Sequence, residues 1–279
     1  MDWVKVKKQI LFFLALLNVS LFVLIYVNNR AYSLPQGRQQ LITSLLRENN
    51  ITCYVDILAN FSPMRQIEMQ PPDYDAGAFV KLLVSDPESI VKSVERNKNI
   101  YKNDRETLVI DDAEVSYRNR SGVAEIIISS EDAEIISTEL LKKINGLGGN
   151  FTADRLNPIE TEYGWLFQYK DRYRGYVINS NSLEITVNGN GIASVSYRYL
   201  KPAAFIGARR EICSADEALL TVMREIKNIY GENMEPKLIT RMEIVYHNNF
   251  SARATPYYRV HISGRETPFL INAYENTIL

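Results

Sequence analysis

The sequence predicts an α+β protein in which a membrane-spanning helix precedes a folded part of antiparallel sheets, each packed by helices. Three observations support this prediction. Residues 10–27 form an apolar run without a charged side chain. Beyond residue 30, apolar residues recur at helical spacing in some segments and alternate with polar residues in others. The chain also contains 17 tyrosines and many β-branched residues, which favour strands.

The apolar run at residues 10–27 has the length of a transmembrane anchor helix. About 18 residues, at about 1.5 Å each, just cross a hydrocarbon core of about 30 Å. Lys5, Lys7 and Lys8 precede the run. Because positive charge is enriched on the cytoplasmic side of membrane helices, residues 1–9 are predicted to be a cytoplasmic tail and the main domain to be extracytoplasmic.

A cleaved secretory signal is the alternative interpretation of this run. Residues 31–33, Ala-Tyr-Ser, would be a passable cleavage site. The apolar region of such a signal is usually only about 7 to 15 residues long, however. The sequence therefore favours a permanent, single-pass anchor in the cell membrane.

Residues 33–130 are predicted to form the N-terminal extracytoplasmic unit. Its first helix carries apolar residues at positions 41, 42, 45 and 46 and ends before Asn49. A second helix is predicted to begin at Asp86, because a proline and a glutamate follow this capping residue. A turn is expected at residues 119–122. Extended segments are predicted at 51–58, 64–70, 79–84, 106–112, 114–118 and 124–129.

Residues 131–279 are predicted to form the C-terminal extracytoplasmic unit. A helix near its start ends at the glycines that begin at position 146. Ser214 and Glu217 form an S-x-x-E capping box at the start of a second helix, which Gly231 ends. Strands are predicted at 164–173, 175–189, 191–200, 238–249, 256–263 and 268–279.

The sequence Asn-Gly-Asn-Gly at residues 188–191 lies between two alternating runs and predicts a hairpin turn. A glycine-rich phosphate loop is the alternative for these residues. Such a loop would require a helix directly after it, whereas IASVSYRY follows. The hairpin is therefore favoured.

The sequence is poor in catalytic and metal-binding patterns. His247 and His261 are the only histidines, and they lack the spacing of a zinc ligand set. Cys53 and Cys213 have no local base, and we expect free thiols, with a disulfide as the open alternative. A net charge of -1 argues against nucleic acid as a partner. We expect no enzymatic activity, no cofactor and no metal. Carboxylate pairs such as Asp111 with Asp112 and Glu160 with Glu162 could in principle do acid–base chemistry, but acidic residues near turns are usually only solvated.

Several motifs resemble the YycI branch of the YycH/YycI family. The chain begins with MDW and a lysine-flanked anchor, and its first extracytoplasmic helix ends in RENNI. SADEAL, MEIVYH, PYYRVHI and FLINAYENTIL follow in the C-terminal unit and are similar to the elements of that family and of the PepSY-like module. Tyr258 and Asn276 depart from the pattern, which often has Trp and Gly there.

The resemblance implies two YycH/PepSY-like units and regulation without catalysis. Proteins of this branch act with a YycH-like partner on a WalK/YycG-type sensor histidine kinase, in a two-component system that controls cell-wall metabolism in Gram-positive bacteria. Contacts among transmembrane helices are expected to carry much of this control. The alternative is a PepSY-like binding or peptidase-inhibitory module for which the anchor is only a tether.

One face of the anchor is the candidate partner surface. Asn18 is a polar side chain at the centre of the apolar run, and its amide would lack hydrogen-bond partners in hydrocarbon unless another helix met it. The alternative is that Asn18 bonds to its own backbone. The predicted face consists of Leu11, Ala15, Asn18, Phe22 and Ile25.

Overall fold

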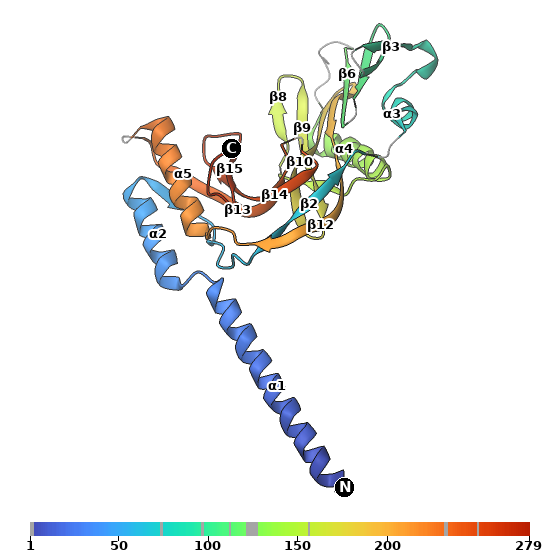
Figure 1. The fold of residues 1–279 in the computed structure, drawn as a ribbon. Coiled ribbons are helices and arrows are strands. Elements are labelled where there is room, and N and C mark those ends of the chain that lie inside the picture. The colour runs from blue at the N-terminus through green and yellow to red at the C-terminus, as the bar shows by residue number, and fades with distance from the viewer. Residues whose placement is uncertain are drawn as a thin grey trace. The chain divides into compact units, whose positions relative to one another are not determined.

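The protein folds into two compact units, each assembled from segments that are far apart in the sequence. Its structure, a computed structural model, describes residues 3–72, 75–95, 98–111, 113–120, 128–155, 157–231, 234–249 and 251–279. Figure 1 shows the elements of this mixed α+β chain. Unit 1 comprises residues 1–64, 208–243 and 257–279, and unit 2 comprises residues 65–207 and 244–256. Each unit therefore mixes residues of the predicted ranges 33–130 and 131–279.

The described residues of unit 1 form the α-helices α1 (Trp3–Ala31), α2 (Gln36–Glu48) and α5 (Ala215–Tyr230). Helix α2 ends where the sequence predicts and buries Ile42 and Leu46. The capping box of α5 is confirmed, because the Glu217 carboxylate accepts a hydrogen bond from the Ser214 backbone N–H at 3.1 Å. Helix α2 packs against α5.

Short strands complete unit 1. Strand β1 (Ile51–Cys53) pairs in parallel with the start of β13 (Lys237–His247), and β15 (Phe269–Asn272) pairs antiparallel with β14 (Arg253–Ile262). Helix α2 contacts β1, and α5 contacts β15. The predicted strand at 51–58 is thus limited to its first three residues.

Unit 2 is built on a long antiparallel sheet. Its strand order β10-β11-β6-β5-β4-β3 has β9 on the other side of β10. Strands β7 and β8 pair with β9, β2 pairs with β14, and residues 177–178 of β10 run parallel to residues 245–246 of β13. The remaining strands are β2 (Met64–Gln70), β3 (Val91–Glu95), β4 (Lys98–Lys102), β5 (Glu106–Ile110), β6 (Glu114–Asn119), β7 (Phe151–Ala153), β8 (Ile159–Thr161), β9 (Gly164–Tyr173), β10 (Tyr176–Asn188), β11 (Gly191–Arg198) and β12 (Lys201–Arg210).

The predicted hairpin at 188–191 is confirmed. Asn188 pairs with Gly191 at the end of the β10–β11 ladder. Gly191 has a φ of 99°, a conformation that residues with a Cβ rarely adopt. The turn therefore depends on this glycine.

Helices α4 (Ser130–Asn145) and α3 (Ala76–Leu83) cover the core of unit 2. Helix α4 contacts β9, β10 and β11, and α3 contacts β5. Tyr197 is fully buried between Phe79 of α3 and Phe151 of β7, with ring centroids 5.3 and 5.5 Å away. Each such buried aromatic ring stabilises the fold by about 1.5–3 kcal/mol.

Two predictions between residues 76 and 95 are wrong. The predicted strand at 79–84 is helix α3, whose N-terminus is capped by the Asp75 carboxylate and whose residues Phe79 and Leu83 are buried one turn apart. The predicted helix at Asp86 is a single 3₁₀ turn (η1, Pro87–Ser89), because the next residues form β3 and pair with β4. The predicted strand at 124–129 and turn at 119–122 fall largely on residues 121–127, outside the described residues.

Candidate functional site

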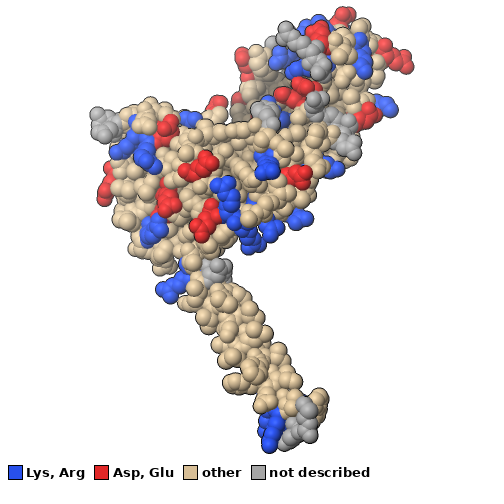
Figure 2. Space-filling model, viewed as in Figure 1, with Lys and Arg blue, Asp and Glu red and all other residues tan. Residues whose placement is uncertain are grey.

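The most distinctive functional element of the chain is helix α1. By length and composition, its residues Trp3–Val27 could cross a membrane, and none of them is buried by the rest of the chain. Figure 2 shows α1 as an almost uncharged surface with basic side chains at its N-terminal end. An N-terminal helix of this kind is compatible with a single-pass anchor and with a signal sequence.

The predicted partner face lies on the exposed surface of α1. Leu11, Ala15, Asn18, Phe22 and Ile25 are all exposed. The Asn18 side-chain amide donates a hydrogen bond to the Leu14 carbonyl at 2.9 Å, so the backbone bond that we considered as the alternative is present. This bond uses one of the two amide hydrogens and leaves the side-chain oxygen available. A second helix could therefore still bond to Asn18.

The chain enters the folded part of unit 1 directly after α1. Leu34 is only 2% exposed, and its N–H donates to the Ala59 carbonyl at 2.6 Å. The Phe61 N–H donates to the Tyr32 carbonyl at 3.0 Å, and the two rings meet edge to face. The Tyr32 hydroxyl also lies 3.3 Å from the Glu211 carboxylate. The helix is thus attached to unit 1 within three residues of its last turn.

An ion pair then links α2 to the start of α5. The Arg38 guanidinium reaches the Asp216 carboxylate through Nε at 2.8 Å and through Nη2 at 2.6 Å. The Asp216 side chain is 9% exposed and also accepts from the Ser214 hydroxyl. A guanidinium that donates two charge-assisted hydrogen bonds to a carboxylate fixes the relative position of the two side chains better than a single surface contact does. Within unit 1, defined contacts therefore connect the end of α1, through residues 32–34, to α2 and then to α5.

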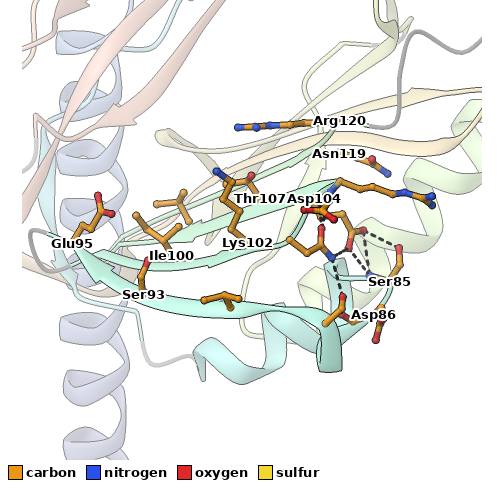
Figure 3. A pocket seen from close by; sticks show the side chains of 16 residues that line it. Ser85, Asp86, Ser93, Glu95, Ile100, Lys102, Asp104, Thr107, Asn119 and Arg120 are labelled. Atoms are coloured by element: carbon orange, nitrogen blue, oxygen red, sulfur yellow. Dashed lines mark hydrogen bonds between the residues drawn. The ribbon is translucent and has the colours of Figure 1, made fainter.

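Unit 2 contains a hollow of about 910 Å³ on the outer face of the β3–β6 meander. Figure 3 shows Ser93, Glu95 and Ile100 at one end and Ser85 and Asp86 at the other. Acidic and basic side chains both line it, and the sequence analysis did not predict it. The lining residues are Ser85, Asp86, Ser89, Val91, Ser93, Glu95, Ile100, Lys102, Asn103, Asp104, Arg105, Glu106, Thr107, Val109, Asn119 and Arg120.

The buried carboxylate of Glu106 forms part of this hollow. It accepts hydrogen bonds from the Ser85 and Tyr117 hydroxyls, both at 2.9 Å, and more weakly from the Asn103 amide at 3.4 Å. Burial and the adjacent carboxylate raise the pKa of Tyr117, which keeps the hydroxyl protonated as a donor. These bonds join Ser85, just before η1, to β5. The role of the Glu106 carboxylate is therefore structural.

Both cysteines and the Asp111 carboxylate, which were considered for chemistry, are among the described residues. Among the described residues, no three or more His, Cys, Asp or Glu side chains are placed to hold a metal ion. Cys53 and Cys213 are free, half-buried thiols; burial raises both pKa values, that of Cys213 to about 12. Asp111 pairs with Lys98 at 2.9 Å, and Asp112 lies outside the described residues.

Comparison with known proteins identifies the fold. No protein-family model matches the sequence. No curated protein matches it either. The fold is similar to the crystal structure of an uncharacterized protein from Eubacterium rectale, with a TM-score of 0.55 and 11% identity over 82% of this chain and 90% of that chain.

The second similar structure is YycH from Bacillus subtilis, with a TM-score of 0.50 and 11% identity over 77% of this chain and 56% of that chain. The chain therefore has a YycH-like α+β fold, as the sequence motifs predicted. A match to the Bacillus megaterium YpeB C-terminal domain has a TM-score of 0.41 and 11% identity over 75% of this chain and 96% of that chain, and it supports no conclusion.

Proposed function

We propose that the chain is a non-enzymatic, membrane-anchored regulatory protein of the YycI branch. It acts with a YycH-like partner and modulates a WalK/YycG-type sensor histidine kinase in a two-component system that controls cell-wall metabolism. Residues 1–9 lie in the cytoplasm and residues 10–27 cross the membrane. The rest of unit 1, from residue 33 on, and all of unit 2 lie outside the cell. The YycH-like fold and the motifs of the C-terminal part support this proposal.

The observation that carries the proposal is the direct attachment of α1 to unit 1. A helix that only tethers a domain needs no fixed contacts after it and works equally well with a flexible linker. Here Leu34 is buried. The Tyr32 carbonyl accepts from the Phe61 N–H, the Tyr32 ring contacts the Phe61 ring, and the Tyr32 hydroxyl bonds to Glu211. A shift or rotation of α1 therefore displaces residues 32–34 and, through Arg38, the start of α5.

An insertion separates a signalling helix from a tether. Four residues, Gly-Ser-Gly-Ser, placed between Ala31 and Tyr32 lengthen the connection without changing either unit. We expect the inserted chain to reach the membrane and to bind its YycH-like partner but to lose its effect on a kinase-dependent reporter. The matched control is the same insertion after Glu266, in an exposed turn of unit 1, which should leave the reporter unchanged.

The partners themselves are tested by affinity purification of the intact chain from membranes. A YycH-like protein and a sensor histidine kinase should co-purify with it. Absence of both, together with an unchanged reporter after the insertion at Ala31, would reject the regulatory role.

The alternative function is a tethered PepSY-like binding or peptidase-inhibitory module. The hollow of about 910 Å³ in unit 2 is the observation that favours it, since its volume is typical of ligand pockets. Inhibition of an extracellular peptidase by the full chain, with no effect of the insertion at Ala31, would support this alternative.

A further inference from the structure

Strand β12 ends in an exposed pair of arginines. Residues 207–211, Gly-Ala-Arg-Arg-Glu, are all exposed. The Arg210 guanidinium stacks on the Tyr274 ring at 4.3 Å from its centroid, and the Tyr274 hydroxyl is fixed by a 3.1 Å bond to the Met64 carbonyl. Arg210 therefore has a defined position on unit 1.

The end of α1 limits the distance between this pair and the membrane. The apolar span ends at Val27 and the helix at Ala31, which is four residues, or about 6 Å, farther along the axis. Tyr32 follows at most about 3.6 Å later, and its hydroxyl lies 3.3 Å from the Glu211 carboxylate. The headgroup layer on each side of the hydrocarbon core is about 5–7 Å thick. Glu211 and the arginines before it therefore lie close to the point at which the chain leaves the membrane span.

Two further features fit a membrane-facing surface. The Tyr32 and Phe61 rings meet edge to face at 6.2 Å just beyond the helix, and aromatic residues are enriched at the membrane–water boundary. Arg30 lies in the last turn of α1 and adds a third positive charge. The field of an anionic surface decays over about 8 Å at physiological salt, so it acts most strongly on residues next to the end of the membrane helix.

Protection of an open sheet edge is the competing explanation for the arginines. Strand β12 is the terminal strand in the sheet order, and charged side chains commonly prevent such edges from pairing with other strands. That role explains charge along the edge. It does not explain why the pair lies beside the residue that leaves the membrane helix.

We propose that Arg30, Arg209 and Arg210 bind anionic phospholipid headgroups and thereby hold unit 1 against the membrane surface. This proposal rests on the anchor role of α1 in the proposed function. Each basic residue near an anionic surface strengthens association by about five-fold. Tyr32 bonds to Glu211, which directly follows the arginine pair, so lipid binding would stiffen the attachment of α1 to unit 1.

The test uses the full chain in lipid nanodiscs and measures amide hydrogen exchange by mass spectrometry. Discs of phosphatidylcholine alone are compared with discs that also contain phosphatidylglycerol. We expect several-fold slower exchange at residues 207–211 in the anionic discs, and we expect raised salt to remove the difference. Arg209→Gln with Arg210→Gln should abolish it, whereas Lys201→Gln with Arg253→Gln, two exposed basic residues elsewhere, should retain it.

The outcomes separate this proposal from the one on which it rests. Equal exchange in the two lipids, with the chain retained in the discs, overturns the headgroup contact and leaves the anchor intact. Loss of the chain from the disc fraction counts against the anchor and against the headgroup contact together. Substitution of Arg210 also removes its contact with Tyr274, so Arg209→Gln alone is the second variant. Unchanged exchange in α5 shows that unit 1 is still folded in the variants. A lipid effect that persists in both arginine variants also overturns the proposal.

Discussion

His247, on β13 in unit 2, makes two side-chain hydrogen bonds that define its proton position. Its Nδ1 lies 3.2 Å from the Asn179 amide nitrogen, which is a donor, so Nδ1 accepts. Its Nε2 lies 2.9 Å from the Asn249 side-chain oxygen, so Nε2 donates. The neutral ring satisfies both bonds. A proton on Nδ1 would face another donor.

Acidification should therefore weaken unit 2 through His247. Burial lowers the pKa of His247 below its ordinary value of 6.5. Between the lowered pKa and 6.5 the unfolded chain binds a proton that the folded chain does not, so stability rises with pH and is lost as pH falls through this window. In urea unfolding of the detergent-solubilised chain, we expect a smaller loss of stability on going below pH 6.5 for His247→Gln than for the unsubstituted chain. Parallel pH profiles would contradict the assignment.

Substitution of Asn18 tests whether the predicted partner face of α1 associates with another helix. Its second amide hydrogen and its side-chain oxygen remain available for a neighbouring helix, and a bond of this kind contributes about 0.6 kcal/mol on average within membranes. Asn18→Leu should therefore weaken association with the partner helix by about three-fold in a membrane two-hybrid assay, with insertion unchanged. The control Val19→Leu changes another face and should have no effect. Equal behaviour of the two variants would favour the tether.

At the scale of elements, a buried arginine joins β13 to β14. The Arg259 side chain is 1% exposed and reaches Glu243 through Nε at 3.0 Å and Nη2 at 2.7 Å. Arg241 reaches the same carboxylate at 2.7 Å. Two guanidinium groups thus share the Glu243 carboxylate.

Removal of Glu243 should be costly. Glu243→Ala removes the carboxylate that Arg259 and Arg241 share, and breaking a buried ion pair typically destabilises a protein by about 3–5 kcal/mol. The exposed Glu235 on the segment before β13 is the control, and Glu235→Ala should stay within about 0.5 kcal/mol. Chemical unfolding of the full chain in detergent measures both. A similar small effect for the two variants would show that water reaches Arg259.

The sequence predicted those elements whose signal is local. The capping box at Ser214 and the hairpin at 188–191 each depend on a few adjacent residues, and both are present. The run FVKLLV at 79–84 was misassigned because a short apolar segment suits a strand or a buried helix turn equally. The Asp86 signal produced only one turn, since pairing of β3 with β4 overrides the local helix preference.

At the scale of the whole molecule, the sequence predicted the anchor but not its attachment. Length, lack of charge and flanking lysines predict a helix that could cross a membrane without any knowledge of the fold. Arg38 and Asp216 are 178 positions apart, and the hollow combines side chains from several strands and loops. No sequence pattern specifies such long-range contacts. The division of unit 1 into three separate chain segments was hidden for the same reason.

The orientation of the chain in the membrane is the last prediction. Lys5, Lys7 and Lys8 precede the apolar span, so translocation of the short N-terminal tail would carry three charges across the bilayer, whereas the C-terminal part crosses as a polypeptide during export. We expect residue 279 outside the cell. Protease added to intact, wall-stripped cells should digest an epitope at the C-terminus and spare one at the N-terminus.

Charge reversal provides the control for this orientation. Replacement of the three lysines by glutamate removes the positive bias while the apolar span keeps its length, so a larger fraction of the chain should become protected from protease. A C-terminal epitope that is already protected in the unsubstituted chain would contradict the topology.

An epitope found free in the culture medium, on a chain shortened by about thirty residues, would show that the run at residues 10–27 is a cleaved signal. The fixed contacts of Tyr32 and Leu34 would then stabilise unit 1 without carrying any motion from the membrane.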